Sequence, residues 1–167
     1  MTAAARKTAP LSAQAHVFPV TVYWEDTDAG GVVYYANYLC YAERGRTELL
    51  RTLGVNQRVL VETEGFNFVV RRIAVDYIAP ARLEDVLEIV TVVRTVTGAS
   101  VEMEQVIRRG GDVLVRMDVT LACINARGRA TRLPADIART FAQASSGSAP
   151  RPHGRNAHQV RNHRRRL

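Results

Sequence analysis

The sequence predicts an α+β fold: a single domain in which one long helix packs against a strongly curved antiparallel sheet of about five strands. One strand-like segment is followed by one long helical segment and then by four β-branched segments. The pair Gly110-Gly111 separates the last two long segments and is typical of a tight hairpin, which makes those strands antiparallel neighbours. A chain of 167 residues with 47% apolar content can build one sizeable core.

The first strand is expected over residues 17–24, and an acidic, glycine-bearing turn leads from it into the helix. The helix is expected from about Tyr35 to Leu53, where Gly54 is a typical stop. Its buried face is predicted from apolar residues at helical spacing, namely Leu39, Ala42, Leu49, Leu50 and Leu53. Its polar positions are Glu43, Arg44, Arg46, Glu48 and Arg51. Gly45 in mid-helix is either simply tolerated or permits close approach of a partner backbone.

The remaining elements follow from β-branched runs and the turn residues between them. A short helix is expected over residues 57–62. Strands are expected over residues 66–77, 86–97, 101–109 and 113–124, and a final helix over residues 134–142.

Charge is concentrated at the two ends of the chain. Residues 17–144 hold fifteen arginines against sixteen acidic residues, whereas six further arginines follow residue 144 without any acidic residue. We therefore expect a disordered extension over residues 1–16, a folded domain over residues 17–144 and a disordered Arg-rich tail over residues 145–167. The tail is either a solvated extension or a weak attachment to an anionic surface or to an acyl carrier protein.

The cysteines and the hydropathy pattern indicate a cytoplasmic protein. Cys40 and Cys123 form neither a paired framework nor a metal-ligand spacing, so buried free thiols are expected. No apolar run approaches the roughly 18 residues of a membrane span, and the N-terminus lacks an apolar signal core.

The most informative segment is the junction between the first strand and the helix, WEDTDAGGVVYYANY over residues 24–38. It puts the Asp28 carboxylate beside a helix N-terminus, where backbone N–H groups are unpaired. Such a pairing suits attack on a carbonyl, because the N–H groups hold a developing oxyanion while the carboxylate attacks or activates water. Two structural alternatives are that Asp28 caps the helix and that Glu25, Asp26 and Asp28 bind a divalent cation.

This segment, extended to Glu48, resembles the signature of the 4-hydroxybenzoyl-CoA thioesterase family of hotdog folds. The nearest likeness is to its YbgC-like branch of acyl-CoA thioesterases, which is associated with the Tol-Pal envelope system. The later segments FVVRR over residues 68–72 and VDYIAPARLED over residues 75–85 agree with this. The resemblance covers about residues 17–142.

The resemblance implies a hotdog thioesterase that acts on short-chain or aromatic acyl-CoA without a metal or cofactor. It assigns the catalytic carboxylate to Asp28 and the carbonyl-polarising N–H to Tyr35, and it places Gly31, Val33 and Tyr34 at the substrate. Arg71, Arg72 and Arg82 are the expected contacts to the CoA phosphates. It also implies a homodimer with active sites at the subunit interface, commonly paired into a homotetramer.

Two departures from the family pattern leave alternatives open. This chain has Tyr35 where some YbgC-like relatives have His, and Trp24 where they have Tyr. Glu43 on the helix is a second candidate for the catalytic carboxylate, although a surface ion pair explains it more simply. A non-catalytic module that binds acyl-CoA or acyl carrier protein is the rival function. A hydratase is disfavoured because His16 is the single His near the core.

Overall fold

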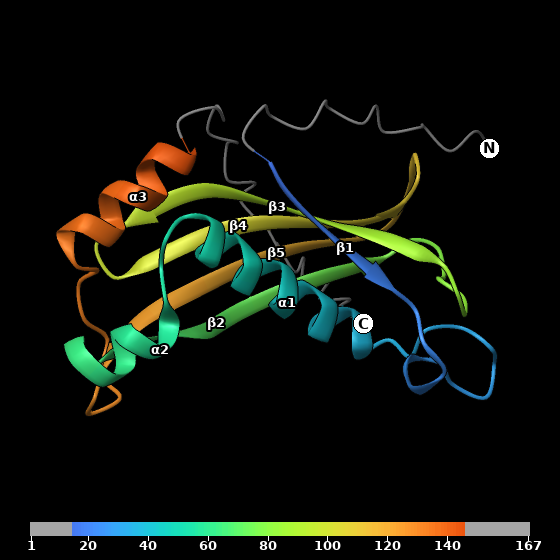
Figure 1. Cartoon of the computed structure of the whole chain (residues 1–167), viewed down its shortest axis with the longest axis horizontal. Coiled ribbons are helices and arrows are strands. Elements are labelled where there is room, and N and C mark those ends of the chain that lie inside the picture. Colours follow the sequence, from blue (N-terminus) through green and yellow to red (C-terminus); the bar gives the residue numbers. More distant parts are fainter. Residues whose placement is uncertain (1–14, 146–167) are drawn as a thin grey trace, which may run out of the picture.

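The computed structural model describes residues 15–145, which form one antiparallel sheet around a central helix (Figure 1). The five strands lie in the order β1-β3-β4-β5-β2. Their bounds are His16–Thr21 (β1), Phe66–Tyr77 (β2), Val86–Thr97 (β3), Ser100–Arg109 (β4) and Asp112–Asn125 (β5). Helix α1 (Asn37–Thr52) lies across one face of the sheet. The predicted α+β architecture is confirmed.

The sheet is built from antiparallel pairs with three irregularities that bend it, one of them between Ile107 and Arg108 where β4 pairs with β5. The predicted hairpin joins β4 to β5 through Gly110, whose φ of 58° lies in the left-handed region that glycine tolerates. The register shifts between Val70 and Arg72 in β2, which leaves Arg71 as an extra residue. A similar shift leaves Arg94 extra in β3. Bulges of this kind increase the local twist, and twist lets a sheet curve around a helix.

Helix α1 packs closely against β3, and Gly45 is the point of closest approach. A Cβ atom at this position would lie 2.6 Å from Cγ2 of Ile89 on β3. Two carbon atoms cannot approach so closely. The packing of α1 against β3 of the same chain therefore requires glycine at position 45. Ala42, Leu49 and Leu50 on the same helix are buried as predicted.

Two predictions about side-chain burial on α1 are wrong. Arg46, expected at a polar surface position, is only 5% exposed because its side chain reaches the sheet and meets Gln105 on β4. Cys40, expected to be buried, is exposed because it lies on the opposite side of the helix from Tyr38 and Ala42. Cys123 on β5 is a buried free thiol, as predicted.

Shorter helices complete the described chain. Asn56 caps α2 (Gln57–Val59), because its side chain accepts the N–H groups of Arg58 and Val59, and one π-helical turn over Leu60–Glu64 continues it. Helix α3 (Ala135–Ser145) covers one end of the sheet, where the Phe141 and Phe68 rings meet edge to face at 5.8 Å.

The predicted terminal extensions, 1–16 and 145–167, lie outside the described residues except for residues 15, 16 and 145. None of the helices described between residues 15 and 145 has the length and apolar character that crossing a membrane requires.

Candidate active site

The segment between β1 and α1 folds back on itself as a narrow turn. The N–H of Asp28 donates to the carbonyl of Val32 at 2.9 Å, and the N–H of Gly31 donates to the carbonyl of Asp28 at 3.0 Å. At the base of the turn the N–H of Tyr34 donates to the carbonyl of Asp26 at 2.9 Å. Asp28 and Tyr35 therefore stand on opposite limbs of one turn, just before α1 begins at Asn37.

The Asp28 side chain is exposed and is held by its own turn. Its Oδ1 accepts the N–H of Gly30 at 2.8 Å, an arrangement typical of Asx turns. The N-cap of α1 is Ala36, which forms no side-chain capping bond. The alternative that Asp28 caps the helix is therefore wrong. This bond restrains the orientation of the exposed carboxylate.

Asp26, two residues earlier, is a structural anchor for the same turn. Its carboxylate is buried, and Oδ2 accepts the N–H of Tyr23 at 2.8 Å. Its carbonyl accepts the N–H of Tyr34 and the Nδ2 of Asn37, both at 2.9 Å. Burial, reinforced by the Asp26 carboxylate, raises the pKa of the Tyr41 hydroxyl far above its ordinary value. Asp26 thus fixes the path of the chain into α1, whereas Asp28 is presented to solvent.

Acidic residues of this turn do not gather into a cation site. Between residues 15 and 145, no three His, Cys, Asp or Glu side chains are grouped closely enough to hold a metal ion. Glu25, Asp26 and Asp28 therefore do not form the alternative divalent site, because the Asp26 carboxylate turns back to Tyr23 and the Asp28 carboxylate to Gly30.

Free N–H donors lie at the start of α1. The N–H of Val33 donates to the carbonyl of Ala81 at 2.9 Å, and that of Tyr34 is held by Asp26, so neither can bind a substrate oxygen. The next two N–H groups, those of Tyr35 and Ala36, have no acceptor within the described part of the chain. They lie at the positive end of the α1 dipole, which favours a negatively charged oxygen.

A group of tyrosines surrounds these free donors. The Tyr77 hydroxyl, at the end of β2, donates to the carbonyl of Tyr35 at 3.0 Å. The Tyr38 hydroxyl accepts the N–H of Ala81 at 2.8 Å and is buried. Sequence reasoning missed both contacts: Tyr77 bonds to the peptide that carries a free donor, whereas Tyr38 supports the chain at Ala81 from inside the fold. The sequence feature that could have indicated a role for Tyr77 is its position in the segment 75–85, three residues before Pro80.

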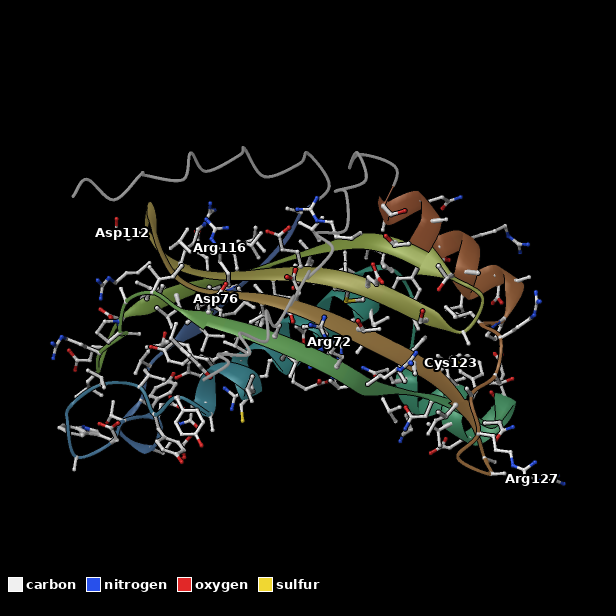
Figure 2. The ribbon with its side chains drawn as sticks, turned by 180° about the vertical axis from the view of Figure 1, so that it is seen from behind. Arg72, Asp76, Asp112, Arg116, Cys123 and Arg127 are labelled. Carbon is white, nitrogen blue, oxygen red and sulfur yellow. The ribbon has the colours of Figure 1, made fainter. Side chains whose placement is uncertain are left out.

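The three arginines expected to bind CoA phosphates are exposed but occupy different places. Arg72 lies on the sheet face that turns away from α1, together with Asp76 and Arg116 (Figure 2). Arg71 is the extra residue of the β2 bulge. Arg82 follows β2, and its N–H donates to the Asp85 carboxylate at 2.7 Å. Among residues 15–145, none of the three forms an ion pair.

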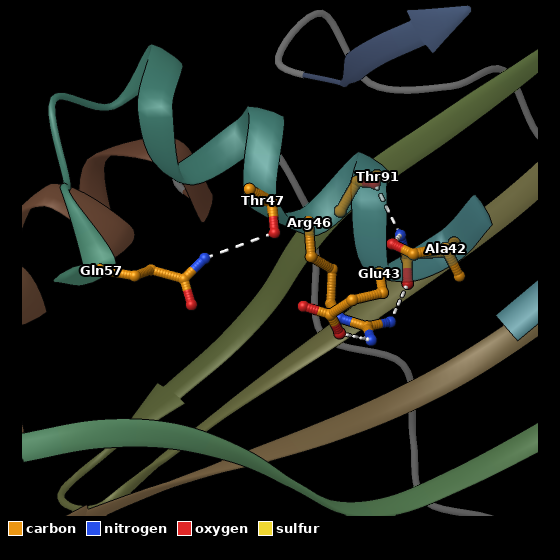
Figure 3. Close-up of polar contacts among 7 residues, drawn as sticks. Ala42, Glu43, Arg46, Thr47, Gln57 and Thr91 are labelled. Atoms are coloured by element: carbon orange, nitrogen blue, oxygen red, sulfur yellow. Dashed lines mark hydrogen bonds and ion pairs between the residues drawn. The ribbon is translucent and has the colours of Figure 1, made fainter. Parts of the chain in front are cut away.

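A cavity of about 460 Å³ lies at the other end of α1. Its lining includes Thr47, Arg51 and Arg58, and Figure 3 shows the Nε2 of Gln57 donating to Oγ1 of Thr47 across 3.4 Å. None of the predicted site residues lines this cavity. It is therefore separate from the junction that carries Asp28.

Comparison with known proteins decides the family. The model of the thioesterase-like superfamily matches residues 22–141, which include the whole junction and the five predicted site residues from Asp28 to Tyr35. The chain belongs to this superfamily. The acyl-CoA thioesterase YbgC of Haemophilus influenzae is 48% identical over 108 residues, 65% of this chain and 79% of that protein. The acyl-CoA thioester hydrolase YbgC of Escherichia coli O6:H1 is 42% identical over 128 residues, 75% of this chain and 95% of that protein.

Two solved structures share the fold. A probable thioesterase from Bartonella henselae is 42% identical with a TM-score of 0.70, covering 72% of this chain and 99% of that one. A 1,4-dihydroxy-2-naphthoyl-CoA thioesterase from Synechocystis has the same TM-score at 19% identity, and at that identity the likeness concerns the fold alone. The helix and curved sheet are thus those of a hotdog fold, as the sequence resemblance implied.

Proposed function

We propose that this protein hydrolyses the thioester bond of acyl-CoA, giving a free acid and CoA, with short-chain or aromatic acyl groups favoured. The observation that carries the proposal is the turn before α1, where an exposed carboxylate and two N–H groups without an acceptor among residues 15–145 occupy opposite limbs. The similarity to proteins named acyl-CoA thioesterase or thioester hydrolase, at 42–48% identity, supports the same reaction.

The N–H of Tyr35, with that of Ala36 beside it, polarises the thioester carbonyl. As the carbonyl carbon is attacked, negative charge develops on its oxygen, and preorganised N–H donors stabilise that charge. The competing donors of Val33 and Tyr34 are already held by Ala81 and Asp26. Because its two preceding neighbours already have acceptors, the Tyr35 N–H is supported as the main donor to the substrate.

Asp28 supplies the attacking group by one of two routes. As a nucleophile, its oxygen bonds to the carbonyl carbon, the C–S bond breaks, CoA leaves as the thiolate, and water then hydrolyses the mixed anhydride. As a general base, it accepts a proton from a water molecule that attacks the carbonyl directly. The thiolate is a good leaving group, so neither route requires a general acid or a metal.

Substrate and subunit contacts extend the proposal. Gly31, Val33 and Tyr34 shape the site beside the acyl group through the turn that they form, and Arg71, Arg72 and Arg82 attract the CoA phosphates. β1 and β2 are the two edge strands, and an edge that is 12 residues long can pair with a second copy. We propose a homodimer, or a homotetramer built from two dimers, in which a second copy completes the site.

The experiment is steady-state thiol release from short, long and aromatic acyl-CoAs by the wild type and by Asp28→Asn. The substitution keeps the size of the side chain but removes its charge, so we expect kcat to fall on the order of 100-fold or more. Asp112→Asn, which removes an exposed carboxylate from the β4–β5 hairpin, is the matched control and should retain full turnover.

The other outcomes are equally informative. If Asp28→Asn retains turnover and Glu43→Gln loses it, the carboxylate role belongs to Glu43 on α1. If no ester is hydrolysed but acyl-CoA binds measurably, the protein is a binding module instead of an enzyme.

A further inference from the structure

Aromatic side chains from two distant segments meet where α1 begins. The Tyr35 and Tyr77 rings lie edge to face with centroids 6.3 Å apart, and the Tyr38 and Tyr77 rings lie 5.8 Å apart. Tyr77 is the last residue of β2, 42 positions along the chain from Tyr35. The end of an edge strand is thereby joined to the turn that carries the free N–H donors.

The contact involves the backbone of Tyr35. The Tyr77 hydroxyl donates to the Tyr35 carbonyl at 3.0 Å. That carbonyl shares one planar peptide unit with the N–H of Ala36, and in a trans peptide the two groups point in opposite directions. A hydrogen bond that fixes the carbonyl therefore also fixes the direction of the Ala36 N–H. The same hydrogen bond restrains the ψ torsion of Tyr35, which sets the direction of the Tyr35 N–H relative to its carbonyl.

The other hydrogen bonds to the backbone of residues 33–36 come from backbone atoms. The N–H groups of Val33 and Tyr34 donate to the carbonyls of Ala81 and Asp26. Ala36 supplies no side-chain cap to α1, so the first turn of the helix depends on contacts from outside. Tyr77 supplies a side-chain bond to this stretch that one substitution can remove without altering the backbone.

We propose that Tyr77 is a positioning residue whose hydroxyl holds the Tyr35–Ala36 peptide so that the N–H donors at the start of α1 face the developing oxyanion. This inference rests on the proposed thioesterase function. Tyr77 does not need to touch the substrate, because it acts through the Tyr35 carbonyl. Partial burial, with a further effect of Tyr35, raises the pKa of the Tyr77 hydroxyl, so it remains a proton donor at neutral pH.

The test is Tyr77→Phe, which keeps the ring and removes the hydroxyl. Loss of one bond that preorganises the donors should lower kcat about five- to tenfold, while KM and the dissociation constant of a non-hydrolysable acyl-CoA thioether stay within about twofold. Tyr38→Phe is the matched control. It removes the neighbouring phenol that accepts the buried N–H of Ala81, so it should lower the thermal midpoint but leave kcat within about twofold.

A second measurement is independent of activity. Because the Tyr35 carbonyl and the Ala36 amide belong to one peptide, Tyr77→Phe should shift the Ala36 amide nitrogen resonance in NMR spectra, and Tyr38→Phe should not. An unchanged kcat or an unchanged Ala36 resonance in Tyr77→Phe would overturn the positioning role, and so would a fall in kcat matched by an equal rise in KM.

Failure of the proposed function gives a different result. In that case the wild type releases no thiol, or Asp28→Asn is as active as the wild type. If the wild type is active and Asp28→Asn is not, an unaffected Tyr77→Phe rejects only the inference about Tyr77.

Discussion

Arg46 on α1 and Gln105 on β4 are hydrogen-bonded to each other inside the protein, between helix and sheet. Nη1 of Arg46 donates to Oε1 of Gln105 at 2.7 Å, and both side chains are buried. Nε2 of Gln105 in turn donates to the carbonyl of Ala42 and to Oγ1 of Thr91, each at 2.9 Å. The other end of the Arg46 guanidinium pairs with Glu43. One amide thus ties the helix to β3 and β4 at once.

Gln105→Leu should destabilise the protein far more than a typical core substitution of equal size. The leucine fills the space but leaves a buried guanidinium N–H without its acceptor, and Ala42 and Thr91 lose their contact with the amide. Unpaired buried polar groups cost about 2–4 kcal/mol when one of them is charged. Urea-induced unfolding of the variant and the wild type measures the difference in the free energy of unfolding.

The double variant with Arg46→Met is the control for this network. When both partners become apolar, no buried charge is left without a partner, so the cost should be smaller than the sum of the two single costs by about 1 kcal/mol or more. Strict additivity of the two substitutions would show that the bond between Arg46 and Gln105 does not couple helix and sheet.

Gly45→Ala tests the close approach of α1 to β3. Alanine is the better helix former by about 1 kcal/mol, yet its Cβ would overlap Cγ2 of Ile89, and overpacking of this kind costs about 1–3 kcal/mol. We expect a lower thermal midpoint. In an Ile89→Ala background, which removes the overlapping methyl group, the same substitution should cost almost nothing. An equal cost in both backgrounds would contradict the packing explanation.

Most elements were predictable because their sequence signals are local. Strands β2 and β3 have the predicted bounds, and the hairpin at Gly110 is present. Burial on α1 was harder to predict, because a charged side chain such as Arg46 enters the interior only when a residue 59 positions away supplies its acceptor. The contact of Tyr77 with Tyr35 was missed for the same reason, since no spacing in the sequence relates the end of β2 to a carbonyl before α1.

The site was predictable as a motif but not as a geometry. Asp28 and Tyr35 were chosen from one continuous segment, and their turn is set by bonds within that segment. The different roles of Asp26 and Asp28 could not be predicted from the sequence. Both are aspartates in the same acidic run, and only the fold determines which carboxylate is buried.

His16 at the start of β1 should make stability depend on pH. Burial lowers the pKa of its ring, and the Glu48 carboxylate opposes this with a smaller effect. The unfolded chain therefore binds the proton more readily than the folded chain. The stabilising contribution is present above the ordinary His pKa of about 6.5 and is lost as the pH falls through the lower folded value.

His16→Gln, which does not titrate, isolates this contribution. The free energy of unfolding of the wild type minus that of the variant should decrease from about pH 8 to about pH 5. All other titrating groups are common to both proteins and cancel in the difference. A difference that stays constant, or grows in acid, would refute the predicted direction.

Gly30→Ala tests whether the position of the Asp28 carboxylate matters for turnover. A Cβ on Gly30 would lie 3.0 Å from Oδ1 of Asp28, so the carboxylate must shift by a few tenths of an ångström. The φ angle of Gly30 is not in the left-handed region, so alanine adds no backbone strain there. Displacement of a catalytic group should reduce kcat about three- to tenfold while the thermal midpoint changes little. Gly111→Ala, where no neighbouring atom of the described residues lies within 4 Å of the added Cβ, is the matched control and should change neither quantity. Full activity in Gly30→Ala would mean that the reaction tolerates movement of Asp28, which favours a carboxylate that activates water over one that must reach the carbonyl carbon itself.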